Sequence, residues 1–317
     1  MVYLLLLLGF VLLIKGADYF IDGSSAIATS FRISPLIIGL TVVAFGTGAP
    51  EATISIIAAL EGNADVTIGN IVGSNLLNMS LVVGLTAIIF PLKVESTTIR
   101  KEIPFAFLAT IVLYVLMNDI MQNIVGNTIT RSDGIIFLLF FSIFMYYVIE
   151  AARNSREQNT SIEENIEKQP IGKSTLLTIG GLAAIILGGY FVVENSTVIA
   201  YRFGMSETLV GLTIVAIGSS LPELITSITA AMKKQSEMAL GNIVGSSIFN
   251  ILFVIGISSV ISPLAVNNKM FIDVILLLGL TIILFIFSRT KYTIGKIEGL
   301  ILTLAYILYL IYIILRN

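Results

Sequence analysis

The sequence contains no cysteine and no histidine, and only 12% of its 317 residues are charged. The absence of cysteine excludes disulfides and thiolate metal sites. The absence of histidine excludes imidazole metal ligands and the usual imidazole proton relay. The net charge of −2 indicates no partner of either sign, and no basic stretch indicates nucleic-acid binding.

The sequence is dominated by long apolar runs. Hydrophobic residues make up 56% of the chain and the mean hydropathy is +0.98, whereas a soluble domain carries about twice this charged fraction. Because the runs approach the ~20 residues that cross a bilayer, we predict an all-α polytopic membrane protein. The run Val2–Ile14 follows no basic region and precedes no convincing cleavage site, so we interpret it as a helix rather than a signal peptide.

We expect ten transmembrane helices, which are separated by short loops and one longer polar segment. The helices are expected at 1–29, 34–60, 65–90, 102–118, 133–152, 173–201, 207–232, 236–261, 270–288 and 294–315. The polar segment 153–172 is interpreted as a charged, flexible linker. It divides the chain into a first five-helix half, 1–152, and a second five-helix half, 173–317.

The basic residues are distributed unequally between the two sets of loops. Of the 18 lysines and arginines, thirteen lie in one set, four lie in the other, and Lys15 lies within the first span. The richer set is Arg32, Lys93, Arg100, Lys101, Arg153, Arg156, Lys168, Lys173, Lys233, Lys234, Arg289, Lys291 and Lys296. The positive-inside rule places this set in the cytoplasm. We therefore expect both termini outside the cell membrane and the linker 153–173 in the cytoplasm.

The chain matches itself when it is shifted by 172 residues. GLTVVAFGTGAPE, 39–51, falls on GLTIVAIGSSLPE, 211–223, and GNIVGSNLLN, 69–78, falls on GNIVGSSIFN, 241–250. The separation of the two motifs is the same in both halves, which chance explains poorly.

Five spans in each half make this duplication an inverted repeat, because an odd number of crossings turns the second half over. Inverted repeats are typical of secondary transporters, with the ion or substrate site near the midplane where the repeats meet. Some channels also contain inverted repeats, so the repeat alone leaves conduction open.

Each first motif ends in a glutamate near the middle of its expected span, Glu51 and Glu223. An ionised carboxylate at membrane depth is costly unless it is paired or binds a cation. The motifs contain no lysine or arginine at comparable depth, which argues against a salt bridge. Two carboxylates that meet across a pseudo-twofold axis predict a divalent-cation site. The structural alternative is a pair of protonated glutamates that only join helices.

Oxygen-bearing side chains accompany the glutamates, as a hard cation such as calcium requires. Thr47, Ser219 and Ser220 lie within four residues of a glutamate. In the second motif, a serine and an asparagine four residues apart share one helix face: Ser74 with Asn78, and Ser246 with Asn250. Helix packing explains any one of these residues, but the matched set in two copies favours ligands.

Each first motif also contains helix-breaking residues. Pro50 cannot donate to the carbonyl of Gly46, and Pro222 cannot donate to that of Gly218. We expect each break to free backbone carbonyls for cations, near Ala44 in the first half.

In the second half, we expect the break to free backbone carbonyls near Ala216.

In the second motif, we expect the glycines to allow close helix approach and the asparagines to form helix–helix hydrogen bonds. These residues are Gly69, Gly73, Gly241, Gly245, Asn70 and Asn242.

At these motifs the chain resembles the cation/calcium exchanger superfamily, and within it the prokaryotic sodium/calcium exchangers. The resemblance covers essentially the whole chain, and GTGAPE/GSSLPE with GNIVGSNLLN/GNIVGSSIFN correspond to the two alpha-repeats of that family. It implies an antiporter, not an enzyme, that extrudes calcium against sodium without a cofactor or an obligate protein partner. The two ions would compete at the midplane cluster while the first and sixth helices slide across the other eight.

The resemblance also implies a set of coordinating residues. They are Ala44, Thr47, Gly48, Glu51, Ser74, Asn78, Ala216, Ser219, Ser220, Glu223, Ser246 and Asn250. Two of them depart from the family pattern, because Gly48 stands where a serine is common and Asn250 where an aspartate is common. These departures leave proton/calcium and potassium-dependent sodium/calcium antiport open. A cation channel and an intramembrane enzyme are the alternatives from other classes, and no hydrolase motif supports the enzyme.

Overall fold

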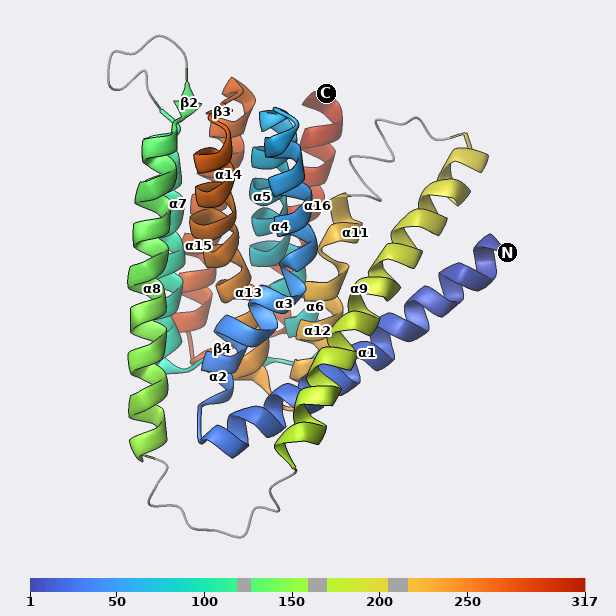
Figure 1. Cartoon of the computed structure of the whole chain (residues 1–317), viewed down its shortest axis with the longest axis vertical. Coiled ribbons are helices and arrows are strands. Elements are labelled where there is room, and N and C mark those ends of the chain that lie inside the picture. The colour runs from blue at the N-terminus through green and yellow to red at the C-terminus, as the bar shows by residue number, and fades with distance from the viewer. Residues whose placement is uncertain (119–126, 159–169, 205–215, 317) are drawn as a thin grey trace.

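The computed structural model describes residues 1–118, 127–158, 170–204 and 216–316 (Figure 1). Almost all of this part is helical. The first half contains α1 (Val2–Phe31), α2 (Pro35–Ile38), η1 (Gly39–Val43), α3 (Ala44–Thr47), α4 (Ala49–Leu60), α5 (Ala64–Leu77), η2 (Asn78–Val82), α6 (Val83–Ile89), η3 (Thr98–Glu102), α7 (Ile103–Leu116) and α8 (Arg131–Gln158). The second contains α9 (Ile171–Arg202), α11 (Ala216–Ser219), α12 (Leu221–Met232), α13 (Ser236–Ile248), η7 (Phe249–Ile255), α14 (Gly256–Ile261), α15 (Asn268–Arg289) and α16 (Lys296–Arg316).

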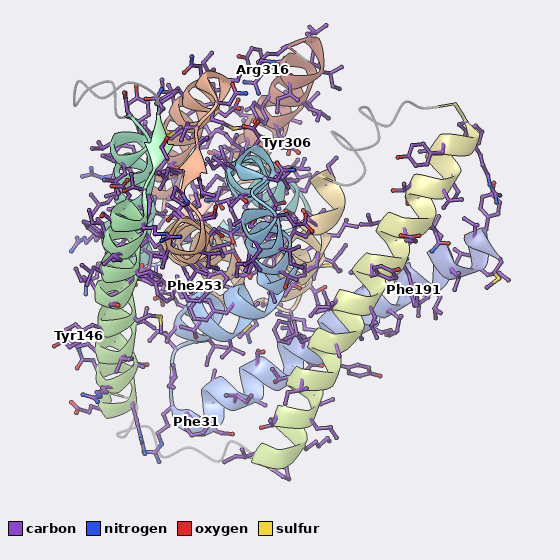
Figure 2. The ribbon with its side chains drawn as sticks, turned by 45° about the horizontal axis from the view of Figure 1, so that its top comes forward. Phe31, Tyr146, Phe191, Phe253, Tyr306 and Arg316 are labelled. Carbon is purple, nitrogen blue, oxygen red and sulfur yellow. The ribbon has the colours of Figure 1, made fainter. Side chains whose placement is uncertain are left out.

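Seven helices in the described ranges are long and apolar enough to cross a membrane, or eight when the bent pair Pro35–Thr47 and Ala49–Leu60 is taken as one span. The other two expected spans fall on shorter segments, η3 with α7, and α11 with α12; part of the span 207–232 lies outside the described residues. Apolar side chains cover the outer faces of the long helices, and Leu4 and Leu176 are more than 70% exposed. Figure 2 shows Tyr146 extending away from the bundle. Such surfaces suit lipid rather than water.

The expected break in the second span is present. The two parts of the pair meet at Gly48 with a bend of 50°. Pro50 occupies the first turn of α4, where its missing N–H removes no helical hydrogen bond. Pro222 stands in the same position of α12, which begins directly after Ser220. Proline therefore starts a new helix in both halves.

Two segments form the centre of the molecule. They are Ala64–Ile89, which contains α5, η2 and α6, and Ser236–Ile261, which contains α13, η7 and α14. In the most apolar stretch of each segment, 78% and 83% of the residues are buried, against 33% in α1 and α9. Both contain a π-helical stretch, η2 and η7. Such stretches are rare and often mark functional sites.

Two short antiparallel strand pairs tie the halves together. β1 (Leu92–Lys93) pairs with β4 (Thr293–Ile294), and β2 (Thr128–Ile129) pairs with β3 (Leu264–Ala265). The pairs lie at opposite ends of the bundle, with β2 and β3 at the top of Figure 1 and β4 near its lower end. Each pair joins one strand from each half.

Helices α1 and α9 cross the remaining helices obliquely and lie against each other along their length (Figure 1). Their backbones approach closely because glycines face the partner helix. A Cβ atom at Gly16 would lie 2.9 Å from the carbonyl oxygen of Gly181, and one at Gly188 would lie 2.7 Å from the amide nitrogen of Leu13.

A salt bridge joins this pair to α12. The Lys233 ammonium lies 2.8 Å from the Asp22 carboxylate and 3.5 Å from that of Asp18, both on α1. It also donates to the Asp18 carbonyl at 2.9 Å. The end of α12 is thus attached to α1 by charge.

The structure differs from the prediction at both ends of the expected linker. Helix α8 continues to Gln158 and α9 begins at Ile171, so both ends of the expected segment 153–172 are helical. Residues 159–169 lie outside the described ranges. The expectation was wrong at the ends because charged residues end an apolar run without ending a helix, since Glu, Arg and Lys are good helix formers.

Candidate cation site

Glu51 and Glu223 lie in the first turns of α4 and α12, and both are completely buried. This position places each carboxylate at the positive end of a helix dipole, which stabilises negative charge. The four ion pairs in the described residues lie elsewhere, at Asp18, Asp22 and Asp273. No salt bridge within the described ranges includes either glutamate.

A chain of hydroxyls from both halves leads to Glu51. Ser220 donates to Glu51 Oε1 at 3.1 Å, and the hydroxyls of Ser74 and Ser220 lie 3.0 Å apart. The second oxygen, Oε2, is buried and has no hydrogen-bond partner among the described residues. Three residues from the expected ligand set are thus in direct contact.

Both oxygens of Glu223 are buried, and neither has a hydrogen-bond partner in the part of the chain that the structure describes. The residue that matches Ser220 in the first half is Gly48. A Cβ atom there would lie 3.7 Å from Asn250 Oδ1 and 3.0 Å from the Ala44 carbonyl oxygen. A side chain at position 48 would therefore lie beside other expected ligands.

Thr47 and Ala44 of the first half form hydrogen bonds with residues of the second half. Thr47 donates to Asn242 Oδ1 at 3.0 Å, and Ser246 donates to the Ala44 carbonyl at 3.3 Å. That carbonyl also accepts from the Gly48 amide at 3.0 Å. The expectation of a free carbonyl at Ala44 does not hold in this conformation, because the first turn before the break still closes and Ser246 donates to the same oxygen.

The two asparagines of the set lie in the π-helical stretches. Asn78 begins η2, which contacts α12, and Asn250 lies in η7, which contacts α4. Each asparagine therefore lies on an element that contacts the helix carrying the other half's glutamate. Both side chains are fully buried, and in the described ranges the side-chain oxygen of each has no hydrogen-bond partner.

The expected helix–helix role of Asn70 and Asn242 is confirmed. Asn70 donates to the Glu51 carbonyl at 3.2 Å and to the Ser55 hydroxyl at 3.0 Å. Asn242 makes the equivalent contacts, to the Glu223 carbonyl at 3.5 Å and to Ser227 at 2.9 Å. These two residues, which match in the repeat, thus also form matching hydrogen bonds.

Sequence reasoning missed some members of this network. Ser55 and Ser227 match each other in the repeat register, which was a usable signal. Asn75 was also missed; it donates to the Ser247 carbonyl at 3.2 Å and accepts from the Asn250 amide at 3.3 Å. It has no asparagine counterpart, because Ser247 matches it in the second half.

The glycines of the second motif behave differently in the two halves. A Cβ atom at Gly245 would lie 2.8 Å from the backbone of Leu40, and one at Gly241 would lie 2.5 Å from the Leu36 carbonyl oxygen. Among the described residues outside its own helical turn, no atom lies within 4 Å of a Cβ atom added at Gly73, and one added at Gly69 would meet only the Met270 side chain, at 3.5 Å. The expected close approach is confirmed for the second half and was wrong for the first, where the glycines line a pocket.

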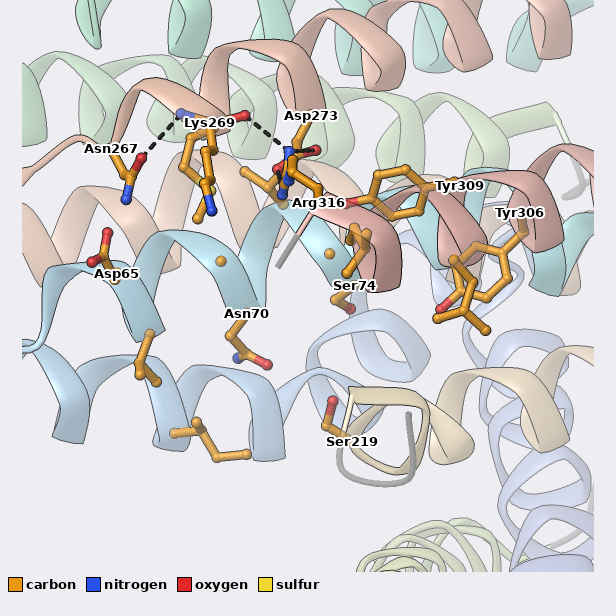
Figure 3. A pocket seen from close by; sticks show the side chains of 18 residues that line it. Asp65, Asn70, Ser74, Ser219, Asn267, Lys269, Asp273, Tyr306, Tyr309 and Arg316 are labelled. Carbon is orange, nitrogen blue, oxygen red and sulfur yellow. Dashed lines mark hydrogen bonds and ion pairs between the residues drawn. The ribbon is translucent and has the colours of Figure 1, made fainter. Parts of the chain in front are cut away.

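That pocket has a volume of about 510 Å³ and lies between α5, α11, α15 and α16 (Figure 3). Its lining includes Asn70, Ser74 and Ser219. Arg316 at the end of α16 forms a bidentate ion pair with Asp273 near the start of α15. The Nη1–Oδ1 and Nη2–Oδ2 distances are 2.9 and 3.0 Å. The pocket therefore connects a charged rim to Ser74, the first hydroxyl in the chain that leads to Glu51. Ala216, the remaining expected ligand, begins α11.

The arrangement suits a hard cation. Two buried carboxylates without a cationic partner cost on the order of several kcal/mol, and a divalent ion would neutralise both. The oxygen types present are those that calcium and sodium accept. Within the described residues no third acidic side chain joins the pair, so the formal charge of the cluster is that of two glutamates.

A protein-family model described as “Sodium/calcium exchanger protein” matches residues 1–150 and 173–315, which is most of the chain. The chain belongs to the sodium/calcium exchanger family. The resemblance seen in the motifs is thereby confirmed. The match omits the region of the linker, so each half of this exchanger is recognised separately.

Relatives cover nearly the whole exchanger. Inner membrane protein YrbG of Escherichia coli is 33% identical over 315 residues, 96% of this chain and 94% of YrbG. Sodium/calcium exchanger MaX1 of Methanosarcina acetivorans is 30% identical over 343 residues, 98% of this chain and 97% of MaX1. A solved structure of the sodium-calcium exchanger NCX_Mj matches with a TM-score of 0.83 at 32% identity, over 97% of this chain and 98% of that one. The chain is thus a multi-pass membrane protein of a transporter family.

Proposed function

We propose that this exchanger extrudes calcium against sodium by alternating access at a cluster built on Glu51 and Glu223. One observation carries the proposal: buried carboxylate and amide oxygens from both halves lack hydrogen-bond partners within the described residues. Such atoms are expensive unless something charged binds them. A cation is the ligand that neutralises the carboxylates and uses the amide oxygens at once.

We further propose ten spans in two inverted halves, 1–152 and 173–317. The equivalent hydrogen bonds of Asn70 and Asn242 support this arrangement. So do the strand pairs, because β1 follows the third span of its half and β3 follows the third span of the other, yet they lie at opposite ends of the bundle. A half turned over in the membrane produces this placement.

The proposed ligand set is the one that the resemblance implies. Calcium and sodium would compete for it, because two carboxylates provide charge for one divalent or two monovalent ions. Ser220 would hold Glu51 in place, while Ser246 would leave the Ala44 carbonyl when an ion binds there. The ions are the substrates of the exchanger.

We propose that the state described here is open toward the outside. The pocket of Figure 3 opens beside Lys269 and Arg316, at the end poorer in basic residues, where the carboxyl terminus also lies. At the other end, close contacts of Gly241 and Gly245 with α2 and η1 seal the cluster. An approach from one side only favours alternating access over a channel, which needs a continuous path.

Calcium-45 uptake into proteoliposomes tests the coupling ion. With sodium trapped inside and calcium outside, we expect the outward sodium gradient to drive uptake at least tenfold above a control with equal sodium on both sides. A protonophore should leave this uptake unchanged. Uptake driven equally well by a proton gradient without sodium would replace the sodium mechanism with proton/calcium antiport. Uptake that requires added potassium would indicate the potassium-dependent form.

The hydroxyl that Gly48 lacks gives a second prediction. We expect Gly48→Ser to bind calcium roughly fivefold more tightly than Gly48→Ala, because one hydrogen bond near Glu223 contributes about 1 kcal/mol. The alanine variant is the matched control, since both variants place a Cβ atom 3.0 Å from the Ala44 carbonyl oxygen. Isothermal titration calorimetry in sodium-free detergent solution measures both affinities. Equal affinities would show that position 48 does not reach the cation.

A further inference from the structure

A second set of pockets lies between α7 and α15, away from the cation cluster. One has a volume of about 270 Å³ and is lined by Ser96, Ile99, Arg100, Pro104, Phe285, Arg289 and Tyr292. The other has a volume of about 210 Å³ and is lined by Ile103, Pro104, Phe107, Thr281, Ile282 and Phe285. Pro104 and Phe285 line both, so the two pockets are adjacent, and together they are here called the α7–α15 groove.

The two ends of the α7–α15 groove differ in chemistry. At one end, Arg100 and Arg289 provide two guanidinium groups, with hydroxyls from Ser96 and Tyr292 beside them and no acidic residue in the lining. Neither arginine takes part in a salt bridge within the described ranges. Two uncompensated guanidinium groups with hydroxyls nearby match a phosphate, which arginine binds through paired hydrogen bonds.

The other end of the groove is apolar. From Arg289 to Thr281 it follows α15 for eight residues, about 12 Å of helix. Ile282 is 45% exposed although it lies within an apolar membrane helix, so its side chain faces the hydrocarbon region. A free anion would use only the basic end and would leave this surface uncovered.

We propose that the α7–α15 groove binds an anionic phospholipid. Its phosphate lies between Arg100 and Arg289, and one acyl chain lies against Phe107, Ile282 and Phe285. Basic pockets between transmembrane helices at the membrane surface bind anionic headgroups in this way. Arg100 belongs to the first half of the chain and Arg289 to the second, so the lipid bridges the two halves.

Native mass spectrometry of the purified full chain tests the proposal, with phosphatidylglycerol and phosphatidylcholine offered separately at equal concentration. We expect one phosphatidylglycerol to be retained at least tenfold more strongly than phosphatidylcholine. The double variant Arg100→Ala/Arg289→Ala should lose about tenfold or more of this retention, since each basic residue adds to the attraction. Equal retention of the two lipids, or an unchanged double variant, would overturn the proposal.

Two further variants make the test specific. Arg153→Ala/Arg156→Ala removes two exposed arginines from α8 outside the groove and should leave retention unchanged; a matching loss would show that only net charge matters. Ile282→Trp should block the acyl end and reduce retention with both arginines present. Inorganic phosphate should not displace the lipid, and displacement would identify a free-anion site instead. Lipid retention involves no ion flux, so its failure is independent of the proposed exchange.

Discussion

Exchange of Glu51 for glutamine is expected to reduce calcium uptake by about a hundredfold or more. Glutamine keeps the shape of the side chain and removes its charge, so one carboxylate remains to balance a divalent ion. Glu223→Gln should have an effect of the same size, because both carboxylates are buried with an unpartnered oxygen. Calcium-45 uptake driven by a sodium gradient measures both.

Glu61→Gln is the matched control, since Glu61 follows the end of α4 and is exposed. It should transport at the wild-type rate. In ion-free buffer the Glu51→Gln protein should be at least as stable as the wild type, because a neutral amide avoids the cost of burying an unpaired carboxylate. A Glu51→Gln variant that keeps more than about a tenth of wild-type uptake would remove this residue from the ion site.

Gly245→Ala is expected to lower the free energy of unfolding by about 2–3 kcal/mol. The added Cβ atom would lie 2.8 Å from the Cα and carbonyl oxygen of Leu40 and 2.9 Å from the Cβ of Ala44, so backbone as well as side chain must move. Unfolding in sodium dodecyl sulfate, followed by circular dichroism, compares the variants without requiring tryptophan, which the chain lacks.

Gly73→Ala is the control for this change, because Gly73 holds the same place in the other repeat and its added Cβ would meet no described atom within 4 Å outside its own helical turn. Both variants lose the same backbone freedom in the unfolded chain. We expect Gly73→Ala to stay within about 0.5 kcal/mol of the wild type. Equal destabilisation by the two alanines would mean that the halves pack alike at this motif.

The sequence predicted the helical class and the break in the second span, because both follow from apolar length and from proline. It did not predict the π-helical stretches around Asn78 and Asn250, which depend on tertiary contacts rather than on local propensity. The strand pairs were also missed. Each contains only two residues per strand and joins segments far apart in the chain, so no local pattern marks them.

Within the site, the repeat register was the most informative signal. It singled out the glutamates, Ser74 and Ser220, and the structure places three of these side chains in one hydrogen-bonded chain. The register could not predict that Gly73 lies open while Gly245 is covered. Identical residues in the two halves have the same side-chain chemistry, but in a single conformation of a transporter the two halves have different surroundings.

Within the described residues, the salt bridge of Lys233 has no counterpart in the other half of the chain. In the repeat register Glu61 replaces Lys233 and Glu194 replaces Asp22, and no salt bridge in the described ranges includes either glutamate. Under the proposed mechanism, the two access states therefore differ in energy before any ion binds. A partly exposed pair contributes at most about 1 kcal/mol, which corresponds to a bias of roughly fivefold in the resting population. Salt would weaken that bias by screening the salt bridge. Ionic strength would therefore shift the resting balance between the two states, in addition to the competition of sodium at the site.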